Sequence, residues 1–212
     1  YCNWSNSMVQ YFIDGGGFMW PILITLLFGF GFTIERFYSL IMSGVDSKVF
    51  FDDVTEAINN GGPKAALEVC EKTRGPVAAI FYAGLTRTHR GLSDVEKAIQ
   101  NAGAIEMAFL EKNMIWLNAV ITIAPMLGFT GTVVGMIAAF DAIKAANDIS
   151  PAVVAGGISQ ALLTTAFGLI VAMIIQTFQN FFVSRIDKLV LDMEEQSVKI
   201  MDHLYEKEAQ NR

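Results

Sequence analysis

Three long windows without a charged residue constrain this chain more than any other feature of its sequence. They cover residues 15–34, 113–140 and 149–184, and most of their side chains are apolar. A helix needs about 20 mostly apolar residues to cross the hydrocarbon core of a bilayer, which is roughly 30 Å thick. The sequence therefore predicts three membrane spans. The whole chain agrees, because 53% of its residues are hydrophobic and only 17% are charged.

The second and third windows are longer than one bilayer thickness. Neither contains a turn signal strong enough to reverse the chain, so each is predicted to continue as helix beyond the membrane. Pro125 lies inside the second window and predicts a kink, because proline removes one helical hydrogen bond. The expected fold class is an all-α membrane protein with three transmembrane helices and long helical extensions.

Lysine and arginine predict the orientation. The segment between the first two spans carries nine of them and the C-terminal tail five, whereas residues 1–20 carry none and residues 141–150 only Lys144. By the positive-inside rule the N-terminus is outside and the C-terminus inside. Cys2 and Cys70 then lie on opposite sides of the membrane, so no internal disulfide is expected. The sequence begins with Tyr1 rather than Met and leaves open what precedes it.

These expectations divide the chain into seven segments. They are a periplasmic interfacial helix (1–17), transmembrane helix 1 (18–40), a cytoplasmic helical region (41–112), transmembrane helix 2 (113–140), a periplasmic loop (141–150), transmembrane helix 3 (151–183) and a cytoplasmic helical tail (184–212).

Local signals add detail to the parts outside the spans. Glycines 15–17 predict a turn into the first span. Gly61-Gly62-Pro63 and Gly75-Pro76 are typical of helix boundaries. Ser93 with Glu96 forms a capping-box pattern, which predicts a helix from Asp94 that runs into the second span. The tail is predicted to present one apolar stripe that is buried against loop helices or another subunit: Ile186, Leu189, Val190, Met193, Val198, Met201 and Leu204.

The second and third spans each carry a face of small and polar residues. The small residues expected to pack helix against helix are Gly128, Gly131, Gly135, Gly157 and Gly168, and the polar ones are Thr132, Gln160, Thr164 and Thr165. Small residues let membrane helices approach closely, and hydroxyls can bond to a neighbouring helix or to their own backbone. Two interpretations stay open at this point: the faces only pack, or they line a polar passage.

The sequence lacks the residues that several classes of function require. The two long windows contain no Asp, Glu, Lys, Arg or His, so a proton carrier for such a passage would belong to another polypeptide. No catalytic motif or cofactor fingerprint is present, and neither an enzyme nor a cofactor is expected. His89 and His203 stand alone, so no metal site is expected. The net charge of -6 gives no support to nucleic-acid binding.

The two polar faces carry a recognisable motif pair. The second span contains GTVVG (131–135) within APMLGFTGTVVGMIAAF, and the third contains ALLTTAFGL (161–169). Together with the three-span order, these motifs resemble the MotA/TolQ/ExbB proton-channel family, and within it the ExbB members most. The likeness in the motifs covers residues from about 93 to the C-terminus, and the order of spans agrees over the rest.

The resemblance implies a homopentamer around a central pore in a bacterial inner membrane. The pore would hold an ExbD-like single-span partner whose membrane-embedded Asp supplies the missing titratable group. The complex would pass the proton-motive force to a TonB-like protein and so energise outer-membrane transport. Carried over by motif, the pore-facing threonines are Thr132 and Thr165, and Gln160 and Thr164 are expected to line the same pore.

The chain departs from ExbB and TolQ at two positions. Gln160 stands where those proteins commonly have Glu, and Ile174 where they often have Pro. The missing Glu removes a charge near the pore and leaves proton and sodium open as the ion. Three alternatives to the ExbB-like role remain: a TolQ-like envelope motor, a MotA-like stator and a non-conducting membrane scaffold.

Overall fold

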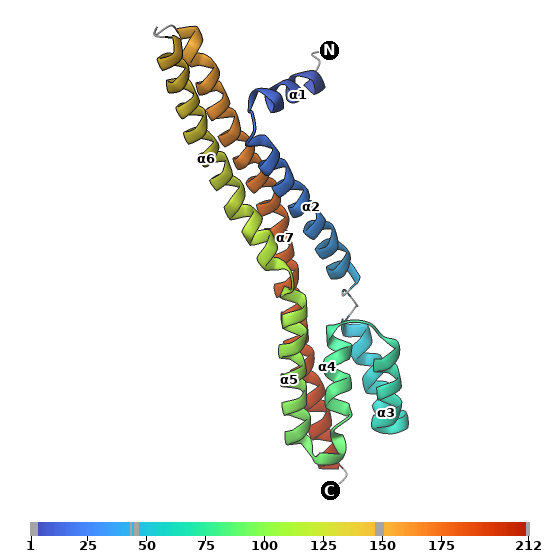
Figure 1. The fold of residues 1–212 in the computed structure, drawn as a ribbon. Coiled ribbons are helices and arrows are strands. Elements are labelled where there is room, and N and C mark those ends of the chain that lie inside the picture. Colours follow the sequence, from blue (N-terminus) through green and yellow to red (C-terminus); the bar gives the residue numbers. More distant parts are fainter. Residues whose placement is uncertain (1–3, 43, 45–46, 147–150, 211–212) are drawn as a thin grey trace. The chain divides into compact units, whose positions relative to one another are not determined.

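The fold is a chain of helices. The computed structural model describes residues 4–42, 44, 47–146 and 151–210, and within these ranges the chain forms no strand. In order, the elements are α1 (Trp4–Asp14), α2 (Met19–Met42), α3 (Ser47–Lys72), α4 (Pro76–Leu85), the 3-10 helix η1 (Thr88–Arg90), α5 (Leu92–Glu111), α6 (Met114–Ala146) and α7 (Pro151–Gln210), as Figure 1 shows. The predicted all-α fold class is confirmed.

Within the described residues, three stretches are long and apolar enough to span a membrane. They are Met19–Ile41 in α2, Leu92–Ala145 over α5 and α6, and Val154–Ala209 in α7. The prediction of three such helices is confirmed, and α7 continues as one helix far past its apolar part. The predicted periplasmic loop at 141–150 falls partly outside the described residues, since α6 extends to Ala146 and residues 147–150 are not described. The orientation and the segment limits stay predictions.

The chain divides into two compact units. The first contains residues 1–35 and 113–180, and the second contains residues 36–112 and 181–212. In the first unit, α6 and the first part of α7 run antiparallel, because Gly128 of α6 lies against Thr164 and Thr165 while Gly135 lies against Gly157.

The turn between α1 and α2 belongs to the first unit. Gly16 adopts φ 72°, a conformation that strongly favours glycine, and the backbone reverses there as the glycine run predicts. An edge-to-face contact between Phe12 and Trp20, with ring centroids 5.4 Å apart, packs α1 on α2. Met8, Val9 and Ile13 of α1 are exposed.

The second unit packs α3, α4, α5 and the end of α7 around an apolar core. Its fully buried side chains include Val54 and Ile58 of α3, Phe81 of α4, Val95 of α5 and Ile200 of α7. As predicted, Gly62 (φ 73°) interrupts α3 before Pro63, and Gly75 precedes the start of α4 at Pro76. Just before this interruption of α3, Lys207 of α7 donates to the carbonyl of Ile58 at 2.5 Å.

Two predictions about α5 are wrong. Ser93 is not an N-cap, because α5 begins at Leu92 after Gly91 and no side chain caps its first turn. The helix also does not run unbroken into the second span. Its last residue is Glu111, and Asn113 adopts φ 66° before α6 begins. Asparagine tolerates this left-handed conformation better than most residues, so it can separate two helices without glycine.

The predicted tail stripe is largely buried in the second unit. Ile186, Leu189, Met193, Met201 and Leu204 are buried as expected, and Val190 is half-buried. Val198 is 61% exposed in the single chain, so only burial against another subunit remains open for it. Ile200 takes its place with 1% exposure.

Candidate functional site

The candidate site is a seam in the first unit where α6 and α7 touch backbone to backbone. A Cβ placed on Gly168 would lie 2.6 Å from the carbonyl oxygen of Ala124, and one on Gly128 would lie 2.9 Å from the carbonyl oxygen of Thr164. Distances this short leave no room for a side chain. These two glycines set how closely the helices approach at this level.

The seam continues along α6 from Gly128 toward its C-terminal end. A Cβ on Gly131 would lie 2.5 Å from the Thr164 hydroxyl oxygen, and one on Gly135 would lie 3.0 Å from the carbonyl oxygen of Gly157. Gly157 in turn approaches the Ala139 side chain, and Ala139 is only 2% exposed. The five glycines singled out in the sequence therefore all lie at the α6–α7 contact.

Thr164 is enclosed in the seam. Its side chain is 1% exposed, and its hydroxyl donates to the carbonyl of Ala161 at 2.8 Å, within its own helix. The prediction placed this residue on a pore. In the described chain its hydroxyl is covered by Gly131, so we leave it out of the pore-facing set proposed below.

Thr165 lies at the edge of the seam and bridges the two helices. Its hydroxyl donates to the main-chain carbonyl of Gly128 at 3.3 Å. The residue as a whole is half-buried. Successive helical residues are rotated by about 100°, which explains why Thr164 and Thr165 differ in burial.

Thr132 lies one helical turn after Gly128 on α6. It is half-buried, and its hydroxyl donates to the carbonyl of Phe129 at 2.6 Å. Because Gly131 faces Thr164, Thr132 and Thr165 belong to the same level of the seam. Their predicted place on a pore stays a prediction.

Gln160 and Pro125 lie at other positions along α7 and α6 than the two threonines. The Gln160 side chain lies against Gly16, so closely that a Cβ on this glycine would overlap the amide nitrogen. Gln160 therefore adjoins the α1–α2 turn. Pro125 lies within α6, where its missing N–H leaves the carbonyl of Ile121 without its helical donor. The expected kink stays a prediction.

A buried amide pair was missed by the sequence reasoning. Gln179 of α7 is 8% exposed and donates to the side-chain oxygen of Asn118 on α6, while its own side-chain oxygen has no partner. A signal was present, because Gly168, Ala172, Ile175 and Gln179 follow at intervals of three or four residues. An amide on a face of this kind is typical of an interhelical hydrogen bond.

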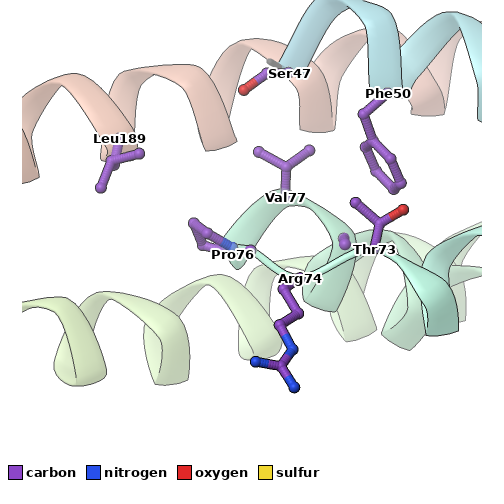
Figure 2. Close-up of a pocket in the computed structure, with 9 residues that line it drawn as sticks. Ser47, Phe50, Thr73, Arg74, Pro76, Val77 and Leu189 are labelled. Carbon is purple, nitrogen blue, oxygen red and sulfur yellow. The ribbon is translucent and has the colours of Figure 1, made fainter. Parts of the chain in front are cut away.

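The small cavity at the start of α4, in the second unit, does not suit a substrate. It encloses about 10 Å³ beside Val77, room for roughly one water molecule. Figure 2 shows Val77 between Ser47 and Phe50, while Arg74 points away from them. Within the described residues, no cluster of three or more His, Cys, Asp or Glu side chains could hold a metal ion.

The fold and the seam define a class: a three-span helical membrane protein whose second and third spans pack through glycines with uncharged hydroxyls beside them. Comparison with known proteins gives the family. A model of the MotA/TolQ/ExbB proton channel family matches residues 72–195, more than half of the chain. The chain therefore belongs to this family.

Individual proteins that are similar to this chain carry names of the same family. An ExbB homologue of Methanothermobacter thermautotrophicus, named a biopolymer transport protein, is 32% identical over 186 residues, which cover 87% of this chain and 66% of the relative. An ExbB-like protein of Synechocystis is 27% identical over 170 residues, covering 79% and 81%. The TolQ protein of the Tol-Pal system in Haemophilus influenzae is 39% identical over 67 residues, covering 32% and 29%. The chain thus spans just under two thirds of the archaeal relative's length.

Proposed function

We propose that this chain is the pore-forming, ExbB-like subunit of an ion-driven motor in a bacterial inner membrane. Copies of the chain, five in our proposal, surround an ExbD-like single-span partner with a membrane-embedded Asp. The assembly transmits the proton-motive force to a TonB-like protein that energises outer-membrane transport. Family membership supports the channel class. The ring, the two partners, the location and the N-out orientation are parts of the proposal.

The observation that carries the proposal is the Thr165 hydroxyl at the seam edge. It donates to the carbonyl of Gly128 at 3.3 Å, a long and neutral hydrogen bond. A hydroxyl can rotate, and a bond to an ionised carboxylate is roughly twice as strong as a neutral one. The Thr165 hydroxyl can therefore break its hydrogen bond to the Gly128 carbonyl and donate to a partner carboxylate when that group is ionised.

The same hydroxyl serves the protonated partner as well. A protonated carboxyl donates through its O–H, and a threonine oxygen can accept this bond while its own hydrogen returns to Gly128. Thr132 offers a second hydroxyl at the same level. Uncharged groups suit this task, because a fixed charge would shift the carboxylate's pKa and hold it in one state.

The test measures proton flux in proteoliposomes that contain this chain and an ExbD-like protein from the same genome. We expect Thr165→Val to lower flux at least tenfold while the ring and partner stay assembled, as judged by native mass spectrometry. Thr132→Val should act in the same direction. Thr177→Val is the matched control, because Thr177 is exposed on the same helix and bonds only to its own backbone carbonyl at Met173.

One competing function is a non-conducting scaffold, and the enclosure of Thr164 among glycines favours it. If Thr165→Val and Thr132→Val both conduct like the wild type, the hydroxyls only pack and the scaffold is the better account. A TolQ-like client is favoured by the match to TolQ and would leave the flux result unchanged. Complementation of TolQ-deficient cells distinguishes the two clients.

A further inference from the structure

A polar cavity lies in the second unit, between α7 and the residues that precede and begin α3. It encloses about 680 Å³ and is lined by Gly44, Ser47, Lys48, Arg185 and Lys188, with Asp192, Glu195 and other residues further along α7. The charged residues of α7 that line it come after the uncharged window of residues 149–184.

Arg185 is the central group of this cavity. Its guanidinium lies over the backbone of Gly44, since a Cβ on that glycine would be 3.0 Å from Nη2. The residue is half-buried. Among the described residues, none accepts a hydrogen bond from Arg185 or forms an ion pair with it. A guanidinium carries five N–H donors, and those of Arg185 that face the cavity are free to bind an anionic acceptor.

The charges in the cavity are separated along α7. Arg185 and Lys188 are one turn apart and form a basic end, whereas Asp192 and Glu195 form an acidic end at least about 6 Å further along the helix. Lys48 acts on the acidic end, since its charge helps to lower the pKa of Glu195.

Glu195 is engaged on its other side as well. Lys199 donates to it at 2.6 Å, and this bond is the main cause of its lowered pKa. Glu195 is thus paired with lysine. The cavity is lined by three cations (Lys48, Arg185 and Lys188) and two carboxylates (Asp192 and Glu195), so positive charge is in excess, and two of the three cations lie at the basic end.

The basic end comes directly after the third span. Arg185 is the first charged residue after the uncharged window of residues 149–184. Gln160 adjoins Gly16 at the start of the first span, so it marks one edge of the hydrocarbon core in this proposal. At about 1.5 Å of helix rise per residue, a core of about 30 Å ends roughly 20 residues further along α7, and Arg185 and Lys188 then lie about 7 and 12 Å beyond it. The polar layer of each leaflet is about 5–8 Å thick, so Arg185 lies within it and the long Lys188 side chain can reach back to it. Asp192 lies about 18 Å beyond the core, outside this layer.

We propose that Arg185 and Lys188 form a binding site for the phosphate of an anionic phospholipid headgroup. Arg185 holds two phosphate oxygens through parallel N–H bonds, Lys188 adds a second positive charge, and Ser47 offers a hydroxyl from the opposite wall of the cavity. The site ties the end of the third span to lipids of negative charge. It does not depend on whether the chain conducts ions.

The experiment titrates the purified protein in neutral detergent with dioctanoyl phosphatidylglycerol or dioctanoyl phosphatidylcholine and follows binding by calorimetry. We expect the wild type to bind the anionic lipid at least tenfold more tightly, because the choline cation is repelled by Lys188. Arg185→Gln should abolish this preference. Lys112→Gln is the matched control, since Lys112 is an exposed cation just before the second span and lies outside the cavity, and it should bind like the wild type.

Two further arms make the result decisive. Inorganic phosphate and glycerol 3-phosphate are titrated in place of the lipid, and if either binds as tightly with the same loss in Arg185→Gln, the ligand is a free phosphate and the lipid proposal fails. Arg185→Lys and Lys188→Gln carry the test if Arg185→Gln does not fold, and each should weaken anionic-lipid binding at least threefold. Equal binding of both lipids by the wild type, or unchanged binding in these variants, overturns the proposal.

Discussion

Thr164 and Thr165 are neighbours in the sequence, yet their hydroxyls donate to different helices. The first bonds to Ala161 in its own helix at 2.8 Å, and the second bonds to Gly128 of α6 at 3.3 Å. Only the second remains half-buried. In our proposal this difference gives the two residues separate tasks, packing for Thr164 and exchange with a partner for Thr165. The predictions below test the parts of this arrangement.

Thr164→Val should leave ion flux within about twofold of the wild type. Valine has nearly the same shape, and the lost hydroxyl bonds only to the residue's own backbone, so the free energy of unfolding should change by about 1 kcal/mol or less. Flux is measured in proteoliposomes beside Thr165→Val. A Thr164→Val variant that conducts nothing, beside a Thr165→Val variant that conducts normally, would reverse our assignment.

Gly157→Ala should destabilise the seam, whereas Gly156→Ala should not. A Cβ on Gly157 would lie 2.7 Å from the carbonyl oxygen of Gly135, but one on Gly156 meets nothing within 4 Å. Overpacking costs about 1–3 kcal/mol. Alanine at 156 should stabilise the helix by up to about 1 kcal/mol. Thermal unfolding in detergent compares the two, and equal midpoints would contradict the close approach.

Gln160→Glu should change which ion drives transport, or how flux depends on pH, without altering assembly. The substitution adds a group that gains and loses a proton beside the Gly16 turn, where the wild type has a neutral amide. Flux is compared under proton and sodium gradients between pH 5 and 8. Identical profiles for the wild type and the variant would remove Gln160 from the proposed path.

Ile200→Ala and Val198→Ala separate buried from exposed positions in the tail. Ile200 is 1% exposed and Val198 is 61% exposed. Removing the buried side chain should lower the free energy of unfolding by about 2–5 kcal/mol. Removing the exposed one should change it by less than about 0.5 kcal/mol in a single chain. Limited proteolysis of the tail in detergent ranks the variants, and equal protection would contradict the packing.

Cys70 should resist thiol reagents from either side of the membrane. Its side chain is 4% exposed, and burial raises the pKa of the thiol from 9.0 to about 12. At pH 8 its thiolate fraction is then roughly a thousandfold smaller than that of an ordinary cysteine, and labelling in native protein should be at least about a hundredfold slower than in detergent-unfolded chain. Equal rates would contradict this burial.

A topology experiment therefore needs other positions. Met8→Cys and Ser93→Cys place thiols on exposed residues of the two units, in a background that carries both Cys2→Ser and Cys70→Ser. We expect an impermeant reagent outside spheroplasts to label position 8 and spare position 93. The opposite pattern would invert the proposed orientation.

Sequence reasoning worked where one physical signal dominates. The length of the uncharged windows predicts the three helices that can span a membrane, and Gly-Pro pairs predict the interruption at Gly62 and the start of α4. It failed where two possible local structures differ little in free energy. Ser93 has good capping chemistry, yet Gly91 at φ 104° precedes the helix, and only the packing of the folded unit decides between them.

The remaining misses have the same origin. Asn113 ends the helix by adopting a left-handed backbone conformation, which is uncommon for residues other than glycine. The sequence has no glycine or proline at this position that would have indicated the break. The buried positions Met193, Gln196 and Ile200 continue at intervals of three and four that pass Val198 by, so the sequence did not show that Ile200, rather than Val198, is buried within the chain. Gln196 belongs to this buried face although it is polar, so the spacing of apolar residues alone did not indicate the face. The cavity around Arg185 joins residues from separate parts of the chain and cannot be found from local pattern.

The glycine seam has a consequence for how this protein can change over time. An apolar core can absorb a substitution, because neighbouring side chains move to other rotamers. Between Gly128 and Gly168 the neighbouring atoms belong to the main chain, and a new side chain there has no rotamer to displace. Mutational drift is therefore confined to the outward faces of α6 and α7. Those faces can adapt to a new lipid or a new subunit while the spacing of the two helices stays the same.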